Sequence, residues 1–359
     1  MLMTQLAKEA DTTAPITENL RAREAQRLVS PKEIKEQLPA SPDLRLNIVE
    51  ARQTVQNIIH GRDQRFLVVV GPCSIHDAES ALEYADRLAA LREEVQDKLY
   101  IVMRVYFEKP RTTVGWKGLV NDPGLDDSCR VSDGIQLGRE LLIQIGSKGI
   151  PAATEFLDPI VPQYIADLIS WAAIGARTTE SQRHREMASG LSMPVGFKNG
   201  TDGTIDTAMN AMRSAGQPHR FLGIDHLGMS CVIETAGNPD CHVVMRGGKN
   251  GPNYQEDKTS EVAFRLSEAS LPEAIMVDCS HANSSKDHNK QPIVLADVIR
   301  QRAKGAKYLV GAMLESHLNE GNQKLIDKPS ELRYGVSITD ACIGWDTTVE
   351  TLRKAAEAL

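Results

Sequence analysis

No apolar run in this sequence approaches the length of a membrane span, and the first forty residues hold no continuous apolar stretch like that of a secretory signal. The six cysteines form no CxxC pair and no compact framework, so reduced thiols are expected and structural disulfides are not. A formal net charge of −7 argues against a general nucleic-acid surface, which needs a positive footprint. These absences predict a cytoplasmic protein with neither a membrane nor a nucleic acid as partner.

What the sequence does contain is typical of a globular α/β protein. Apolar residues make up 41% and charged residues 25% of 359 residues, a length that suits one (β/α)8 barrel with extensions or two medium domains. From residue 66 onward, eight short runs alternate with longer amphipathic segments, and most runs are apolar throughout, as in parallel strands covered on both faces. The runs are FLVVVGPC, LYIVMRV, GIPAATE, SWAAIGAR, PVGFKN, CHVVMRGG, EAIMVDCSH and KYLVGAMLES. They predict a (β/α)8 TIM barrel.

Two additions to the barrel are expected. Ser30 and Ser41 each precede a proline and predict helix N-caps, and Gly61 should end the second helix. We therefore expect an N-terminal arm for regulation or assembly over residues 1–65 and the catalytic barrel over residues 66–359. Between the fifth and sixth strands, residues of about 217–240 are too many for a simple loop, and their strand-like halves flank DHLG, which predicts an inserted β-hairpin.

Polar or ionisable residues follow all eight predicted strands. In a (β/α)8 barrel the carboxyl ends of the strands meet at one mouth, where the active site lies. Charged residues commonly end strands, which would explain any single one of these positions, but eight together favour a functional site. The eight are Cys73, Arg104, Glu155, Arg177, Lys198, Arg246, His281 and Glu315.

Half of these residues are cationic, and the loop after Arg104 adds three more cations. Such a cluster would repel itself unless an anion neutralised it, and arginine offers a forked donor for phosphate or carboxylate. A doubly anionic substrate is the natural partner. The cations are Arg104, Arg177, Lys198 and Arg246, followed by Lys109, Arg111 and Lys117.

The remaining strand-end residues include metal-ligand types. Cys73, His281 and Glu315, with Asp340 after the eighth strand, offer one thiolate, one imidazole and two carboxylates. This set suits one divalent ion of the Mn, Fe, Co or Zn type better than Mg. Other interpretations stay open: a lone cysteine is often a small buried apolar residue, His281 could be a satisfied core histidine, and Asp340 could cap the last helix.

Long motifs in the chain closely resemble the type I 3-deoxy-D-arabino-heptulosonate 7-phosphate (DAHP) synthases, from about residue 30 to the C-terminus. The motifs are GPCSIHD, RVYFEKPRTTVGWKG, GARTTESQ, PVGFKNGTDG, RGGK, SHANSSK, ESHLNEGNQ and YGVSITDACIGW. The resemblance implies a metal-dependent enzyme of the shikimate pathway, which condenses phosphoenolpyruvate with erythrose 4-phosphate and water to give DAHP and phosphate. One departure is RGGKNGPNY, which has an extra residue around Gly251 and leaves the geometry of that loop open.

The resemblance also implies roles for individual residues. It makes Cys73, His281, Glu315 and Asp340 the metal ligands. It assigns phosphoenolpyruvate to Arg177, Lys198 and Arg246, helped by Arg104 and Ala176, and the aldose phosphate to Arg111 and Thr112. Lys109 would lie between the two substrates, and Glu155 would position water or move a proton. Lys109, Glu155, Cys73 and His281 are thus the catalytic candidates.

Regulation is a further implication of the resemblance. It implies feedback inhibition by an aromatic amino acid bound outside the mouth near the hairpin, with Gln163, Ser192 and Phe221 as candidates and a lean toward tyrosine. It also implies a homodimer or homotetramer. The alternatives are a different phosphoenolpyruvate-condensing synthase of the KDO 8-phosphate kind, a non-catalytic regulator that binds aromatic amino acids, and a plain metal-binding module. The intact KPRTT argues against the first, the retained ligand types against the second and the cationic cluster against the third.

Overall fold

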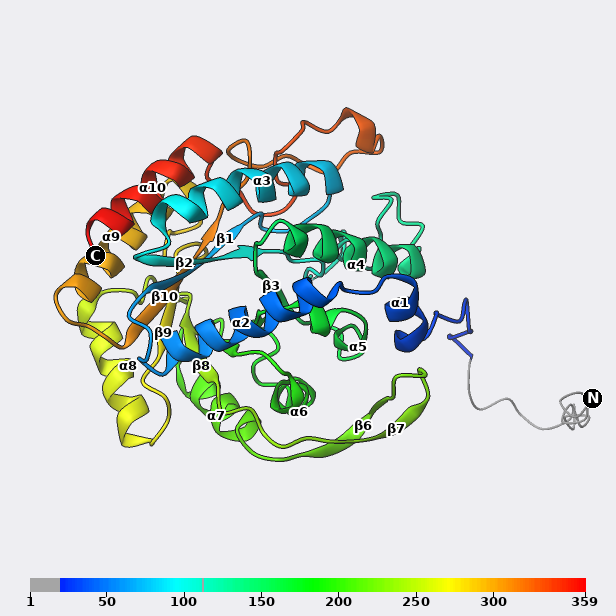
Figure 1. The fold of residues 1–359 in the computed structure, drawn as a ribbon, viewed down its shortest axis with the longest axis horizontal. Coiled ribbons are helices and arrows are strands. Elements are labelled where there is room, and N and C mark those ends of the chain that lie inside the picture. The colour runs from blue at the N-terminus through cyan, green and yellow to red at the C-terminus, as the bar shows by residue number, and fades with distance from the viewer. Residues whose placement is uncertain (1–19, 112) are drawn as a thin grey trace, which may run out of the picture.

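The chain folds around a closed barrel of parallel strands, shown in Figure 1. The computed structural model describes residues 20–111 and 113–359. In that part of the chain the barrel has eight strands in the order β1-β10-β9-β8-β5-β4-β3-β2. They are β1 (Phe66–Gly71), β2 (Leu99–Arg104), β3 (Ala152–Glu155), β4 (Trp171–Ile174), β5 (Val195–Lys198), β8 (Cys241–Met245), β9 (Ile275–Asp278) and β10 (Leu309–Glu315). Every run predicted as a strand contains one of them, so the TIM barrel is confirmed.

Helices surround this barrel. They are α1 (Pro31–Gln37), α2 (Pro42–Ile59), α3 (Ala78–Val95), α4 (Val131–Ser147), α5 (Pro162–Ile165), α6 (Gln182–Gly190), α7 (Asp206–Ala215), α8 (Glu256–Glu268), α9 (Gln291–Ala303) and α10 (Trp345–Glu357). Short 3-10 segments span Ala166–Leu168, His288–Lys290 and Pro329–Glu331. Because helices cover the outside and side chains fill the inside, all residues of the eight barrel strands are buried, which explains why the sequence shows continuous apolar runs.

The two N-terminal helices begin where the serines predict. The Ser30 side chain accepts a hydrogen bond from the backbone N–H of Glu33, and the Glu33 carboxylate accepts one from the N–H of Ser30. The Ser41 side chain accepts one from the N–H of Leu44. Helix α2 ends at Ile59, and Gly61 follows with a φ of +69°, a conformation that favours glycine. The caps and the stop are therefore confirmed, while the division into an arm over 1–65 and a barrel over 66–359 stays a prediction.

Helix α2 closes the N-terminal end of the barrel. Its residues Ala51, Val55 and Ile58 belong to one buried cluster with side chains from inside the barrel. Arg52 donates to the carbonyls of Ala166 and Ile169, just before β4, at 2.7 and 2.9 Å. One face of α2 thus forms a floor under the barrel, which leaves the opposite end for the mouth.

The predicted hairpin is present between β5 and β8. Strands β6 (Arg220–Ile224) and β7 (Ser230–Glu234) pair antiparallel, with Phe221 opposite Ile233. Asp225 accepts hydrogen bonds from the backbone N–H groups of Leu227 and Met229 and so shapes the turn. In Figure 1 the hairpin passes beneath α6 and reaches toward α1, and the N–H of Lys32 donates to the His226 carbonyl at 2.8 Å.

Two expectations about absent features can be checked in the described residues. None of the helices there is long and apolar enough to cross a membrane. All six cysteines are free thiols, as expected from their spacing.

Candidate active site

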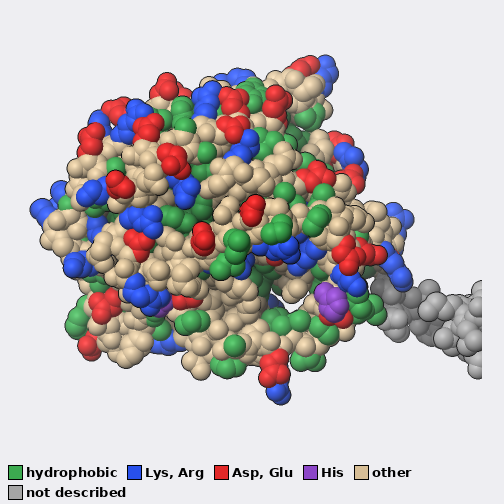
Figure 2. Space-filling model, viewed as in Figure 1, with side chains coloured by type: hydrophobic (Ala, Val, Ile, Leu, Met, Phe, Trp, Pro, Cys, Tyr) green, Lys and Arg blue, Asp and Glu red, His purple; other side chains and the backbone are tan. Residues whose placement is uncertain are grey.

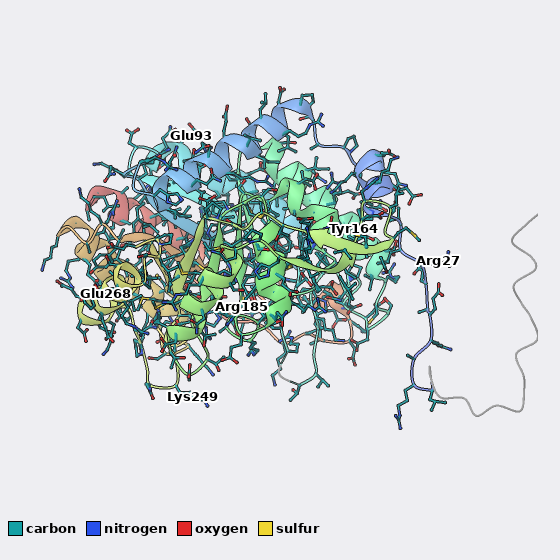
Figure 3. The ribbon with its side chains drawn as sticks, turned by 90° about the horizontal axis from the view of Figure 1, so that it is seen from below. Arg27, Glu93, Tyr164, Arg185, Lys249 and Glu268 are labelled. Carbon is teal, nitrogen blue, oxygen red and sulfur yellow. The ribbon has the colours of Figure 1, made fainter. Side chains whose placement is uncertain are left out.

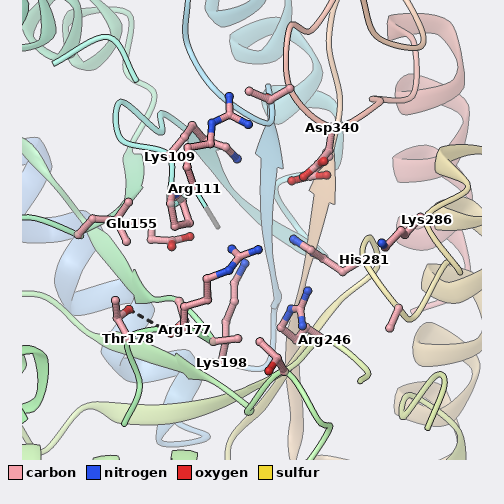
Figure 4. A pocket seen from close by; sticks show the side chains of 18 of the residues that line it. Lys109, Arg111, Glu155, Arg177, Thr178, Lys198, Arg246, His281, Lys286 and Asp340 are labelled. Carbon is pink, nitrogen blue, oxygen red and sulfur yellow. Dashed lines mark hydrogen bonds between the residues drawn. The ribbon is translucent and has the colours of Figure 1, made fainter. Parts of the chain in front are cut away.

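A cavity of about 620 Å³ opens at the carboxyl ends of the barrel strands. Figure 4 shows its cationic side chains facing Glu155, His281 and Asp340 across the opening. The predicted site residues that line it are Arg104, Lys109, Arg111, Glu155, Ala176, Arg177, Lys198, Arg246, His281, Glu315 and Asp340. Cys73 lies buried beside it, and Thr112 lies outside the described residues. The barrel therefore brings together residues that are far apart in the sequence.

Cys73 reaches the mouth because the chain turns sharply at the end of β1. Gly71 has a φ of +154°, and a Cβ there would lie 2.9 Å from the Arg104 carbonyl oxygen, so only glycine fits the close approach of β1 to β2. Cys73, Glu315 and Asp340 each offer a ligand atom, and these atoms lie within 4.8 Å of one another. The Cys73 Sγ is 3.7 Å from Oδ2 of Asp340.

This cluster is held by both backbone and charge. The side chain of Gln291 donates to the Glu315 carbonyl at 3.0 Å and accepts from the Glu315 N–H at 2.8 Å, which fixes the end of β10. Nζ of Lys109 lies 3.1 Å from the Cys73 Sγ. Burial, and next the neighbouring Glu315, raise the pKa of the Cys73 thiol to about 11. The thiol is therefore protonated at neutral pH.

His281, the fourth predicted ligand, lines the same cavity but stands apart from the three clustered donors. Its φ is +57°, and Nδ1 lies 2.7 Å from Oγ of Ser280 and 3.0 Å from Oδ2 of Asp278. Asp278 ends β9 and is 1% exposed, and its Oδ2 is also 3.0 Å from Nζ of Lys198. One buried carboxylate therefore joins a candidate ligand to a candidate substrate-binding lysine.

Asp278 was not singled out in the sequence, although a carboxylate inside an apolar strand, as in IMVD, was a usable signal. Burial alone would raise the pKa of Asp278. The positive charge of Lys198, and then His281, hold the pKa well below its usual value instead. The carboxylate is consequently ionised in the folded protein and acts as a fixed negative charge behind the mouth.

The cations of the mouth differ in how freely they face the cavity. Arg104 is 2% exposed and donates to the carbonyls of Pro72 and Cys73 and to Oε1 of Glu315. Its guanidinium carbon lies 3.7 Å from the ring centre of Tyr106. Arg104 therefore shapes the strand ends, whereas Arg177 and Arg246 project into the opening in Figure 4.

The loop after β8 is fixed by an asparagine that the sequence reasoning missed. Oδ1 of Asn199, the residue after β5, accepts from the N–H of Arg246 at 2.8 Å, and its Nδ2 donates to the Gly247 carbonyl. The departure RGGKNGPNY folds into a tight turn in which Gly248 and Gly251 exchange backbone hydrogen bonds of 3.0 Å. Gly251 has a φ of +102°, so the extra residue is accommodated by a conformation that glycine adopts readily.

Lys109 and Glu155 both line the cavity. Lys109 also donates to the Cys73 carbonyl at 3.3 Å. Glu155 is the last residue of β3, and a Cβ on Gly175 would lie 2.3 Å from its Oε1, so glycine leaves room for that carboxylate. Arg111 donates from Nε to the Trp116 carbonyl at 2.7 Å, which orders the loop after β2.

The three predicted regulatory residues lie away from this cavity. Gln163 belongs to α5, Ser192 follows α6, and Phe221 is half-buried in β6. In Figure 1, α5 and α6 lie on the inner side of the hairpin. Figure 2 shows the molecular surface hollowed between the hairpin and the body.

Comparisons with known proteins agree over nearly the whole chain. Residues 39–353 match the model of the DAHP synthetase I family. The Phe-sensitive phospho-2-dehydro-3-deoxyheptonate aldolase of Escherichia coli K12 is 56% identical over 95% of this chain and 97% of its own. The Tyr-sensitive enzyme of the same strain is 54% identical over 95% and 96%. A solved structure of phospho-2-dehydro-3-deoxyheptonate aldolase from Francisella tularensis SCHU S4 is 45% identical and covers 94% of this chain and 98% of that one, with a TM-score of 0.91.

Proposed function

The chain belongs to the DAHP synthetase I family, and from this premise we propose how the residues of its mouth share the work of DAHP synthesis. The enzyme condenses phosphoenolpyruvate with erythrose 4-phosphate and water, giving DAHP and inorganic phosphate in the first step of the shikimate pathway. The observation that carries the assignment is the cavity itself, in which metal-type donors and a cationic cluster face each other. A plain metal-binding module would leave the cations without a partner.

The donor set fits a divalent ion. A thiol and two carboxylates converge within 4.8 Å, and Cys73 keeps its proton there unless another cation is present. Cys73, Glu315 and Asp340 would hold the ion with His281, whose Nδ1 faces Asp278 and so leaves Nε2 for a metal. Mixed sulfur, nitrogen and oxygen donors favour Mn, Fe, Co or Zn. When bound, the ion would polarise the aldehyde carbonyl of erythrose 4-phosphate.

The cations bind and orient the substrates. Arg177, Lys198 and Arg246 would hold the phosphate and carboxylate of phosphoenolpyruvate, with Ala176 beside them and Arg104 buried behind. Arg111, with Thr112, would take the phosphate of the aldose. Holding both substrates in one cavity converts an encounter of two molecules into a positioned reaction.

The condensation then follows from this arrangement. C3 of phosphoenolpyruvate attacks the aldehyde carbon of erythrose 4-phosphate, and C2 gains positive character. Water adds at C2, and the phosphohemiketal loses inorganic phosphate by cleavage of its C–O bond. The cationic cluster keeps the departing phosphate bound as its charge develops. Lys109 and Glu155 line the cavity and would move the protons, one to the new hydroxyl and one from the attacking water.

An assay of phosphate release tests this function. Release should require phosphoenolpyruvate together with erythrose 4-phosphate, stop after chelation and return on addition of Mn. Equal release with a different aldose phosphate would favour a synthase of the KDO 8-phosphate kind. Binding of an aromatic amino acid without any release would favour the non-catalytic regulator.

Feedback inhibition completes the proposal. Relatives named for phenylalanine and for tyrosine sensitivity are 56% and 54% identical, so the tyrosine lean stays a prediction. Gln163 comes from α5, Ser192 from the segment after α6 and Phe221 from the hairpin, and an aromatic amino acid bound among them would not enter the mouth. Titration of turnover with phenylalanine, tyrosine and tryptophan identifies the effector, and insensitivity to all three would contradict the regulatory site. Assembly as a homodimer or homotetramer and a cytoplasmic location stay predictions.

A further inference from the structure

A second cavity, of about 320 Å³, lies at the N-terminal end of the barrel beneath α2. Its walls come from the starts of barrel strands: Tyr100 is the second residue of β2, Ala152 is the first of β3, and Ser170 directly precedes β4. Figure 3 places Glu93 of α3, the neighbour of a wall residue, and Lys249 of the mouth on opposite sides of the molecule. None of the residues assigned to DAHP synthesis lines this cavity, so the proposed function does not account for it.

The inner wall of this cavity is apolar. Leu44, Ile48 and Ala51 line it from the buried face of α2, and Ile150 and Leu168 line it from the opposite side. These side chains come from segments that are far apart in the sequence and meet only in the folded protein. A ligand body the size of a ring would therefore be removed from water here, and the volume is at the small end of the range for ligand pockets.

Two arginines border the same space. The guanidinium carbons of Arg65 and Arg92 lie 5.1 and 5.9 Å from the ring centre of Tyr100. Arg65 binds Asp63 through Nε and Nη2, and Arg92 donates from Nη1 to the Gly149 carbonyl at 3.0 Å. Among the described residues, Nη1 of Arg65 and Nη2 of Arg92 have no further hydrogen-bond partner. Each arginine therefore keeps a donor for a ligand.

The charge of the lining points to a single negative charge on the ligand. Two arginines and one carboxylate, that of the exposed Glu50, line the cavity, and Asp63 next to it already pairs with Arg65. Among the described residues, Arg92 donates to a backbone carbonyl and to no carboxylate. One carboxylate on the ligand would pair with this arginine, whose fork matches its two oxygens. A phosphate dianion would add a second negative charge beside Glu50 and Asp63 over an apolar wall.

An unpaired hydroxyl provides an independent observation. Ser170 is 0% exposed, and its Oγ has no hydrogen-bond partner among the described residues. Buried hydroxyls are normally paired, because an unpaired one loses its bonds to water without replacement. At the rim, Gly149 has a φ of +78°, and a methyl group there would meet no atom within 4 Å, so the cavity is open at that point.

We infer that this cavity binds a small monocarboxylate with an apolar, ring-sized body. The carboxylate lies on the free donors of Arg65 and Arg92, and the body packs against Leu44 and Ile48. A bound ligand links α2 to α3 and to the starts of β2 and β3, so it stabilises the folded chain by mass action. This site is separate from the mouth, and its existence does not depend on the proposed reaction.

Benzoate is a suitable probe, used with the full-length protein in the presence of excess phosphoenolpyruvate, which fills the mouth. We expect benzoate to raise Tm with increasing concentration and to shift the methyl resonances of Leu44 and Ile48 in protein labelled at leucine and isoleucine methyls. Benzyl alcohol, which lacks the charge, should do neither. Binding of benzoate only when phosphoenolpyruvate is left out, or no binding at millimolar benzoate, would overturn the inference.

Variants locate the site. Arg92→Gln should weaken benzoate binding at least about tenfold, since a hydrogen bond to a charged group is lost. Arg87→Gln is the matched control, because Arg87 lies on the same helix outside this cavity and should leave binding unchanged. Arg65→Gln, which removes the other donor of the carboxylate, should weaken binding by a similar factor and provides the test if Arg92→Gln fails to fold. Equal affinity in all three variants would contradict the site, while DAHP synthesis, measured in parallel, reports on the mouth separately.

Discussion

Replacing Asp278 by asparagine should disturb both halves of the mouth, because this one carboxylate faces Lys198 on one side and the ring of His281 on the other. Its Oδ2 is 3.0 Å from Nζ of Lys198 and 3.0 Å from Nδ1 of His281, and its Oδ1 accepts from the hydroxyl of Ser280 at 2.7 Å. The side chain is 1% exposed, so water cannot replace the lost charge. An amide keeps the shape of the site but leaves Lys198 as an unpaired buried charge.

The expected loss of stability follows from the kind of interaction that is removed, a buried ion pair. Removal of one partner from a buried ion pair typically destabilises a protein by about 3–5 kcal/mol. We expect the lower end, about 3 kcal/mol, because asparagine can still accept from Ser280. Loss of the carboxylate behind a metal-binding histidine typically lowers metal affinity about 10–100-fold. The KM for phosphoenolpyruvate should also rise, since Lys198 loses the group that positions it.

Three measurements separate these effects: urea unfolding of the metal-free protein, metal titration and steady-state kinetics. Asp240→Asn is the matched control, because Asp240 accepts from Gln56 and His60 at 2.8 and 2.7 Å at the floor of the barrel. It should cost about 1 kcal/mol of stability and leave metal affinity unchanged. If Asp278→Asn keeps metal affinity and the KM for phosphoenolpyruvate at their original values, the buried carboxylate does not organise the site.

Three further substitutions examine other parts of the molecule. Cys73→Ser should lower metal affinity, and turnover with it, by more than the roughly 10–100-fold that follows loss of a ligand's hydrogen-bond partner. If metal affinity and turnover both stay at the original level, Cys73 is not a ligand. Burial lowers the pKa of His242 to about 4 from an ordinary 6.5, so the folded protein binds this proton less readily than the unfolded chain does. The full free energy of unfolding is therefore present above pH 6.5, and about 3 kcal/mol of it is lost as the pH falls to 4. His242→Gln, which keeps an acceptor for the Trp171 indole, should flatten that part of a stability–pH curve measured by urea unfolding, and an unchanged slope would exclude His242. Phe221→Ala should abolish inhibition by the aromatic effector with kcat unchanged, whereas retained inhibition in a rate titration would place the effector elsewhere.

Much of the fold was predictable because local signals and tertiary packing agree. The runs that became β1 and β10 are apolar at nearly every position, since both faces of a barrel strand are covered. Ser30 and Ser41 fixed the starts of two helices through side-chain hydrogen bonds within one turn. Such contacts span three residues, so a single sequence contains all the information that they need.

The candidate site was predictable from the sequence only for residues that follow barrel strands. Strand-end residues such as Arg177 and Arg246 share a mouth in any (β/α)8 barrel, and so their convergence followed from their order in the chain. The roles of Asp278, Asn199 and Gln291 depend instead on contacts between segments that are 24 to 80 residues apart in the sequence. No local pattern encodes these contacts, because each depends on the barrel register and on the side-chain conformation of its partner.

The floor of the barrel keeps water out, and the mouth holds the charged side chains that bind substrates. Val55 and Ile58 of α2 seal the floor against Leu67 and Met276, so the barrel interior below the mouth is apolar and buried. In such surroundings electrostatic interactions are stronger than in water, and an unpaired charge is correspondingly costly. Arg104 at 2% exposure is tolerated because it donates to two carbonyls and a carboxylate. The floor thus contributes to function indirectly, since a wet interior would screen the charges that hold the substrates.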